Sequence, residues 1–208
     1  MATYTWPTSH KAYLPSAITW RQRHNSRMSV SSLSGAVQTI SLPGMRWGIT
    51  LEWPQQSYAE RALLEGLLAL LSGPEHRLSL WDLARPVPLG TLNLSGVTMS
   101  AAAQFADTVT LNGCGNTTTL QRGDWLKVTT AAGAQLLQVA TAATATSGGV
   151  MSGVMVRPGL RGAVTAGAAV TLDKPPALFV LAEPELAIPR GGAGICPPFS
   201  VDLVEVFA

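Results

Sequence analysis

Alternation of apolar and polar residues runs through most of the sequence and predicts a protein built mainly of β-strands. The clearest run covers residues 45–53, where two tryptophans, an isoleucine and a leucine share one face. A Leu-Pro-Gly turn at 42–44 separates this run from an apolar stretch at 35–40, so we expect these two segments to form a hairpin with one aromatic face. Further strands are predicted over 77–83, 177–181 and 199–207.

One segment departs from this alternation and predicts a helix over about 57–72. Ser57 and Glu60 match a capping box, and Gly73 with the following proline ends the helix. With so many leucines, both broad faces need cover, and we expect a sheet on one side and a neighbouring subunit on the other. The apolar residues at helical spacing are Ala59, Leu63, Leu67, Leu70 and Leu71, with Leu64 and Leu68 widening the face.

The composition changes near Leu92, and from there to about Leu172 the chain is rich in Ala, Thr, Gly and Val with few charges. Glycine-bearing turns separate short alternating segments, which predicts a small barrel or sandwich of five or six strands. A module can be inserted in an exposed loop at little cost, because closure entropy grows slowly with loop length. We therefore predict a mainly β fold in which a β-sandwich domain with one α-helix, residues 1–92 and 173–208, is interrupted by a small OB-like β-barrel, residues 93–172. The expected barrel strands are 108–111, 125–129, 135–140, 149–157 and 168–172.

Charged residues make up only 12% of the sequence, against 47% hydrophobic residues, whereas about 25% charged residues is usual in soluble domains. Two explanations remain open: neighbouring subunits cover much of the surface, since interface cores are depleted in charge, or the surface is polar but uncharged. The charge is also uneven, because no Asp or Glu precedes Glu52. The basic stretch before it is either an arm or edge that docks on an acidic partner or a solvated strand face.

Residues that could perform chemistry are scattered. Cys114 and Cys196 lie far apart and are expected to be free thiols in a reducing cytoplasm. His10, His24 and His76 do not stand at metal-ligand spacing from one another or from a cysteine. The sequence also has neither a nucleophile elbow nor a phosphate-binding glycine loop.

Two carboxylates, Asp82 and Asp124, stand alone and form no acid–base pair. Asp124 belongs to an Arg-Gly-Asp tripeptide, for which a turn aspartate that caps a hairpin is favoured over a cell-adhesion motif. We therefore expect no catalytic residue, no metal, no cofactor and no enzymatic activity.

An OB-like barrel raises the question of single-stranded nucleic acid, which needs stacking aromatic residues and a basic groove. The insert has only Phe105 and Trp125 as aromatic residues, and strand alternation is expected to bury Trp125, so specific nucleic-acid binding is not expected. The N-terminal residues lack the apolar core of a signal peptide. The longest apolar stretch, 62–71, contains Glu65 and is too short to span a bilayer, so membrane insertion is not expected either.

Several short motifs follow one another in a recognisable order. The first part of the chain has a Ser-, Gly- and Gln-bearing strand, an Arg-Trp strand, a capped helix and a strand that ends in Asp: Trp20, Ser29–Gly35, Gln38, Arg46-Trp47, Trp53 and Leu78–Asp82. The insert has a Gly-Asp-hydrophobic segment and a Pro-x-Leu-Arg segment, in Leu120–Leu126, 135–139 and Val154–Arg161. This order resembles that of distal tail proteins of long-tailed bacteriophages, over most of the chain. Larger members carry a galectin-like C-terminal domain, for which we see no room here.

The resemblance implies a structural virion protein with a β belt domain. Such proteins form a ring, usually hexameric, that joins the tail tube to the tail tip or baseplate hub and lines the DNA channel. The implied partners are further copies of the chain, the tail tube protein and hub or tip proteins, and the implied location is the tail tip, after synthesis in the bacterial host cytoplasm. Two alternatives stay open: another minor tail or hub-proximal protein, and a carbohydrate-binding module that uses the barrel for host-surface attachment.

Overall fold

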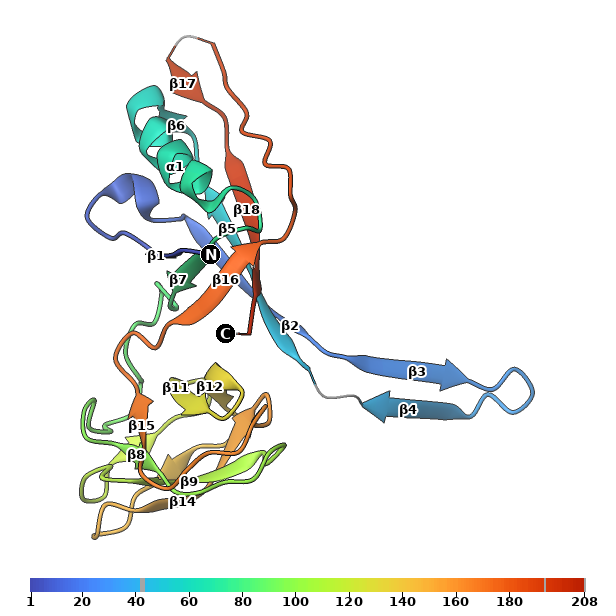
Figure 1. Cartoon of the computed structure of the whole chain (residues 1–208), viewed down its shortest axis with the longest axis vertical. Helices are drawn as coiled ribbons and strands as arrows, with labels where there is room; N and C mark the ends of the chain where they lie inside the picture. Colours follow the sequence, from blue (N-terminus) through green and yellow to red (C-terminus); the bar gives the residue numbers. More distant parts are fainter. Residues whose placement is uncertain (42–43, 193, 208) are drawn as a thin grey trace.

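The computed structural model describes residues 1–41, 44–192 and 194–207, and it is mainly β with one α-helix, as predicted. Figure 1 shows a sheet with the helix beside it, a barrel at the opposite end of the molecule and a two-stranded arm that projects sideways between them. The barrel strands lie in the sequence between β7 and β16, two strands of the sheet.

The sheet has six strands drawn from both ends of the chain. Strand β1 runs parallel to β7, and the remaining neighbours are antiparallel. The last strand of the chain, β18, lies inside the sheet between β16 and β5, so the C-terminal segment completes a sheet that the N-terminal segment begins. The order across the sheet is β1 (Thr3–Thr5), β7 (Arg77–Leu80), β16 (Ala177–Leu181), β18 (Phe199–Glu205), β5 (Arg46–Trp53) and β2 (Ala17–Arg23).

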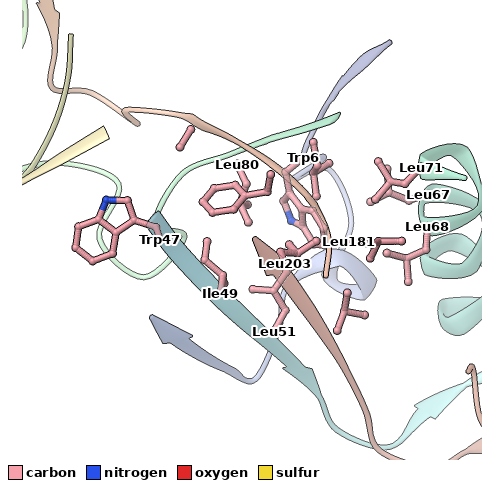
Figure 2. Packing of buried hydrophobic residues seen from close by; sticks show 14 of the residues in the cluster. Trp6, Trp47, Ile49, Leu51, Leu67, Leu68, Leu71, Leu80, Leu181 and Leu203 are labelled. Carbon is pink, nitrogen blue, oxygen red and sulfur yellow. The ribbon is translucent and has the colours of Figure 1, made fainter. Parts of the chain in front are cut away.

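The buried face of the sheet is the one that the alternation predicts. The apolar side chains of β5 are all at most 2% exposed and belong to one hydrophobic cluster with the helix leucines and with β18. Figure 2 shows the helix leucines pointing toward this cluster. The labelled members include Trp47, Ile49, Leu51, Leu67, Leu68, Leu71 and Leu203.

Helix α1 (Tyr58–Leu71) begins with the predicted capping box, in which the Glu60 amide donates to Ser57 Oγ and the Ser57 amide donates to Glu60 Oε2 at 3.2 Å. The chain leaves the helix at Ser72, which adopts a left-handed conformation with φ of 48°.

The buried face of α1 is shifted from the predicted one. Leu63 and Leu70 are exposed, whereas Arg61 is buried together with four leucines. Arg61 tolerates burial because its guanidinium donates to Gln56 Oε1 at 3.1 Å and to Pro197 O at 2.8 Å. The helix therefore faces the sheet with Leu64, Leu67, Leu68 and Leu71.

The predicted hairpin between 35–40 and 45–53 is wrong. Strand β4 (Val37–Ser41) pairs with β3 (Ser26–Val30), and β5 pairs with β2. Together they form one long, bent hairpin, with its base in the sheet and its tip in the arm. Alternation identified the strands but carried no information on their partners, and residues 42–43 of the expected turn lie outside the described residues.

The barrel is closed, and its predicted strands are confirmed to within two residues at each end. It encloses a hydrophobic cluster of its own. The order around the barrel is β11 (Trp125–Thr130), β12 (Gly133–Val139), β14 (Met151–Arg157), β9 (Thr108–Asn112), β8 (Thr98–Met99) and β15 (Ala168–Thr171).

Smaller elements complete the described fold. A short 3₁₀ helix occupies Lys11–Tyr13, and two further strand pairs are β10 (Thr119–Leu120) with β13 (Ala143–Thr144) and β17 (Ile195–Cys196) with β6 (Gln56–Ser57). The predicted β-sandwich is not confirmed: in the part of the chain that the structure describes, the six-stranded sheet packs against α1 and not against a second large sheet.

Candidate assembly interface

The sheet and the barrel meet through three tryptophans. The ring of Trp125, at the start of β11, lies 4.6 Å from that of Trp20 and 4.8 Å from that of Trp47. Its indole Nε1 donates to Asp82 Oδ2 at 3.0 Å, and Trp47 Nε1 donates to Leu136 O at 3.3 Å. The predicted burial of Trp125 is confirmed, but its ring joins the cluster of the sheet, so this residue anchors the barrel to the sheet.

A buried ion pair fastens the same junction. Arg161 Nη2 lies 2.6 Å from Glu205 Oε2, and the two side chains are 11% and 2% exposed. Glu205 also accepts the backbone amide of Trp47 at 3.0 Å, and the Arg161 guanidinium lies 3.7 Å over the ring of Phe207. Burial lowers the pKa of Arg161, and its hydrogen bond to Glu205 opposes that shift. The end of β18 is thus held against the loop that follows β14.

The two isolated carboxylates have structural partners. Asp124 is 3% exposed and accepts the backbone amides of Leu89 and Gln121, each at 2.7 Å. The expected position in a turn is confirmed, but the hairpin is not, because β10 pairs with β13 and β11 pairs with β12 and β15. Burial makes the Asp124 carboxylate inaccessible to an adhesion partner. Asp82 is also buried and accepts the Trp125 indole. Both carboxylates therefore hold together the sheet, the barrel and the segment between β7 and β8 that contains Leu89.

The histidines and cysteines singled out in the sequence lie in separate parts of the described structure. Over residues 1–41, 44–192 and 194–207, no three His, Cys, Asp or Glu side chains could hold a metal ion. Cys114 and Cys196 are buried free thiols, and burial raises the pKa of Cys114. His10 accepts the Ala12 amide at 3.1 Å and so caps the 3₁₀ helix.

A groove of about 840 Å³ opens where the base of the arm meets the barrel. Two of its cations already have partners, because Arg157 lies 3.0 Å from Asp107 and Arg161 pairs with Glu205. Its exposed aromatic residue is Phe105. Single-stranded nucleic acid needs several stacking rings along a basic track, and this groove does not favour that class of ligand.

The arm formed by β3 and β4 is the most exposed part of the described chain. Its strands pair with each other and with no other described strand, and Figure 1 shows the arm projecting away from the sheet. Its apolar residues are open to solvent: Leu33 at the tip is 99% exposed and Met28 is 70% exposed. An isolated hairpin is only marginally stable in water, and exposed apolar patches mark interaction sites. The arm is therefore a candidate contact surface.

The outward face of α1 is a second apolar surface. Leu63 and Leu70 are 42% and 49% exposed, and the exposed residues beside them are Ala62, Gly66 and Ala69. This sector carries no charge, and its small residues allow close approach of another backbone. The sheet covers the opposite face of the helix, so the expected cover by a neighbouring subunit stays a prediction.

No protein-family model matches this sequence, and no curated protein is significantly similar to it. Among the described helical segments, none has the length and apolar character needed to cross a membrane. Function is therefore inferred from the order of the sequence motifs, the buried junction and the two uncovered apolar surfaces.

Proposed function

We propose that this chain is a structural subunit of a bacteriophage tail, a distal tail protein that joins the tail tube to the tail tip or baseplate hub. In this proposal the chain forms a ring, hexameric as in the family that it resembles, and the ring lines the channel through which DNA passes. The subunit is made in the bacterial host cytoplasm and ends at the tail tip of the virion. It is not an enzyme, binds no cofactor and recognises no specific nucleic-acid sequence.

The observation that carries the proposal is the pair of uncovered apolar surfaces on a chain with few charges. The arm exposes Met28 and Leu33, and α1 exposes Leu63 and Leu70, in a sequence that is 12% charged. A ring subunit is covered on both flanks by its neighbours and on two further faces by tube and hub. Such a subunit needs few surface charges, because neighbouring proteins take the place of water.

The order of the two β structures along the chain supports the same proposal. A helix-bearing β domain interrupted by a small β module is what the motif order in the sequence implies for this family. We also propose that the sheet and helix form a β-sandwich belt domain and that the insert is OB-like. The sheet, which has one apolar face, is compatible with the belt domain, and the small closed barrel is compatible with the OB-like insert. An OB-fold has five strands, so the six-stranded barrel would be a variant of it.

The proposal is tested by native mass spectrometry and negative-stain microscopy of the purified chain, alone and mixed with the tube and hub proteins of the same phage. We expect closed rings with a central channel. A strictly monomeric chain that also fails to bind tube or hub proteins would refute the proposal. A map of the tail tip that places the chain elsewhere in the tail would favour another minor tail protein.

Glycan binding by the barrel is the second candidate, and the groove beside Phe105 is the observation that favours it. Glycan sites usually stack sugars on exposed aromatic rings, and the other aromatic residue of the barrel, Trp125, is buried in the junction. A glycan array probed with the intact chain and with the Phe105→Ala variant tests this candidate. Binding that the substitution abolishes would support it, and no binding to any glycan would remove it.

A further inference from the structure

We infer that an extended segment of a partner protein adds to the sheet as a further strand along β2, and that one end of this segment enters the groove at the base of the arm. The inference goes beyond the proposed ring, because this contact needs only one copy of the chain and one partner segment.

Strand β2 forms an open edge of the sheet. It has seven residues, none of them proline, and among the described strands it pairs with β5 alone. The opposite edge strand, β1, has only three residues. A long open edge presents a row of backbone N–H and C=O groups that can pair with another chain. Addition of a strand to such an edge is a common way to bind an extended peptide.

The two faces of β2 favour different side chains in an added strand. Ile18 and Trp20 are half-buried and pack against the hydrophobic cluster of the sheet. Arg21 and Arg23 lie on the opposite face, where both are exposed. An added strand with apolar residues on the first face would extend the hydrophobic cluster beyond the present edge.

The charges on the second face favour carboxylates. Arg21 already has a partner within the chain, whereas Arg23 forms no ion pair with a described residue and lies directly opposite Arg46. Like charges that face each other across two strands are destabilising, so a carboxylate beside Arg23 would relieve this repulsion. The partner segment is therefore expected to alternate apolar and acidic residues.

The groove begins where β2 ends. His24 and Asn25 directly follow the strand and line the groove, which has a volume of about 840 Å³. On its barrel side stands Phe105, which is 59% exposed and has a φ of 67°, a conformation that bulky residues rarely adopt. The Phe105 amide donates to Leu160 O at 2.7 Å and so holds this conformation. Strained residues are concentrated at binding sites, and an aromatic rim favours a large apolar residue at this end of the partner segment.

The occupant of the edge is a different protein rather than a second copy. Among the described strands, β5 and β18 place a carboxylate between two apolar residues, at Glu52 and Asp202, but both strands lie inside the sheet with a neighbour on either side. They are therefore not available to another copy. The arginines of β2 also oppose pairing between two β2 edges, since that would bring like charges together. Charge complementarity thus favours a partner with an acidic, extended segment.

Synthetic peptides test the inference on the intact chain. The probe is a blocked peptide about as long as β2, in which glutamate alternates with valine and a phenylalanine stands at each end. A peptide with lysine in place of glutamate is the charge control. Two further probes carry N-methyl groups, one on the apolar residues and the other on the glutamates, because an added strand directs only alternate amides toward the edge. Binding is measured by isothermal titration calorimetry at low salt, since screening weakens exposed pairs.

We expect the acidic peptide to bind and the lysine peptide to bind about 10-fold more weakly or not at all. One of the two N-methylated peptides should lose binding, and the other should keep it. Hydrogen exchange should slow in β2 when the acidic peptide binds and stay unchanged in β1, the opposite edge.

Variants of the chain locate the contact. Arg23→Glu should weaken binding of the acidic peptide about 10-fold, and Phe105→Ala should weaken it by removing the aromatic rim. The control is Arg122→Glu, which changes an exposed arginine of the barrel and should bind like the wild type. All three variants should melt at the wild-type temperature, because the changed residues are exposed. If a variant melts earlier, the comparison of the N-methylated peptides on the wild-type chain still decides the question.

Absence of binding by the acidic peptide would overturn the inference, and so would equal binding of the lysine peptide or of both N-methylated peptides. Binding that depends on Phe105 but on neither Arg23 nor the peptide amides would place the ligand in the groove alone and overturn strand addition. If the wild-type chain forms rings in which β2 is already protected and the peptide does not bind, a second copy occupies the edge. The inference would then be wrong, and the proposed ring would stand.

Discussion

Replacement of Glu205 by Gln removes the negative half of the buried ion pair at the junction. Gln keeps the size of the side chain and can still accept the Trp47 amide, but Arg161 is left as a buried charge without a counter-ion. Removing one partner of a buried pair costs about 3–5 kcal/mol. The contact of the Arg161 guanidinium with the ring of Phe207 is present in both proteins, so it does not change the difference in stability. We expect a loss near the lower end, about 3 kcal/mol, because the Arg161 side chain is still 11% exposed and water partly solvates its charge.

The free energy of unfolding is measured by urea titration with linear extrapolation. The matched control is Asp202→Asn, which breaks a pair whose side chains are 46% and 50% exposed and should lose less than about 1 kcal/mol. Adding Arg161→Met to Glu205→Gln should recover much of the loss, because no stray charge remains in the junction. If Glu205→Gln loses no more stability than Asp202→Asn, the junction is not held by this pair and the reasoning is wrong.

Further predictions concern the helix. Ser57→Ala should destabilise the protein by about 1 kcal/mol through loss of the cap, and an unchanged melting temperature would contradict the observed helix start. Leu67→Asp should unfold the chain at a much lower temperature because it buries an unpaired charge, whereas Leu70→Asp on the exposed face should melt normally and weaken only assembly. The hydrogen bond from Lys11 is the main cause that lowers the pKa of Glu60 from 4.5 to about 2. The ionised carboxylate thus stabilises the fold above pH 4.5, and this contribution is lost as pH falls toward 2. Melting temperatures of Glu60→Gln should therefore depend less on pH across that window, and an unchanged dependence would contradict this assignment.

Local patterns predicted the elements of this fold better than their partners. The barrel strands and the capped helix followed from alternation, glycine turns and the Ser57–Glu60 pair, all of which act over a few residues. The arm could not be predicted in the same way, because the polar sequence of β3 alternates weakly and pairing between distant strands leaves no local trace. The wrong hairpin arose for this reason.

The sequence predicted only part of the candidate contact surfaces. The absence of carboxylates before Glu52 indicated a basic arm or edge, but the exposed apolar residues of the arm, Met28 and Leu33, were not recognised as a contact surface. Burial of Arg61 and of the Arg161–Glu205 pair was not predicted either. A charged residue in a sequence normally indicates a solvent-exposed position. The partners that allow these three side chains to be buried are distant in the sequence or on another element, and only the fold places them in contact.

The long, bent hairpin has a mechanical consequence. A load on the tip of the arm is transmitted to β2 and β5 at its base, and because the hairpin is bent, part of that load acts along the axes of these two strands. Six residue pairs join β5 to β18, and their hydrogen bonds lie across the direction of pull. Such bonds are loaded in shear, so they share the force and must break together rather than one after another. The arm is thus rooted in the part of the sheet best able to resist tension.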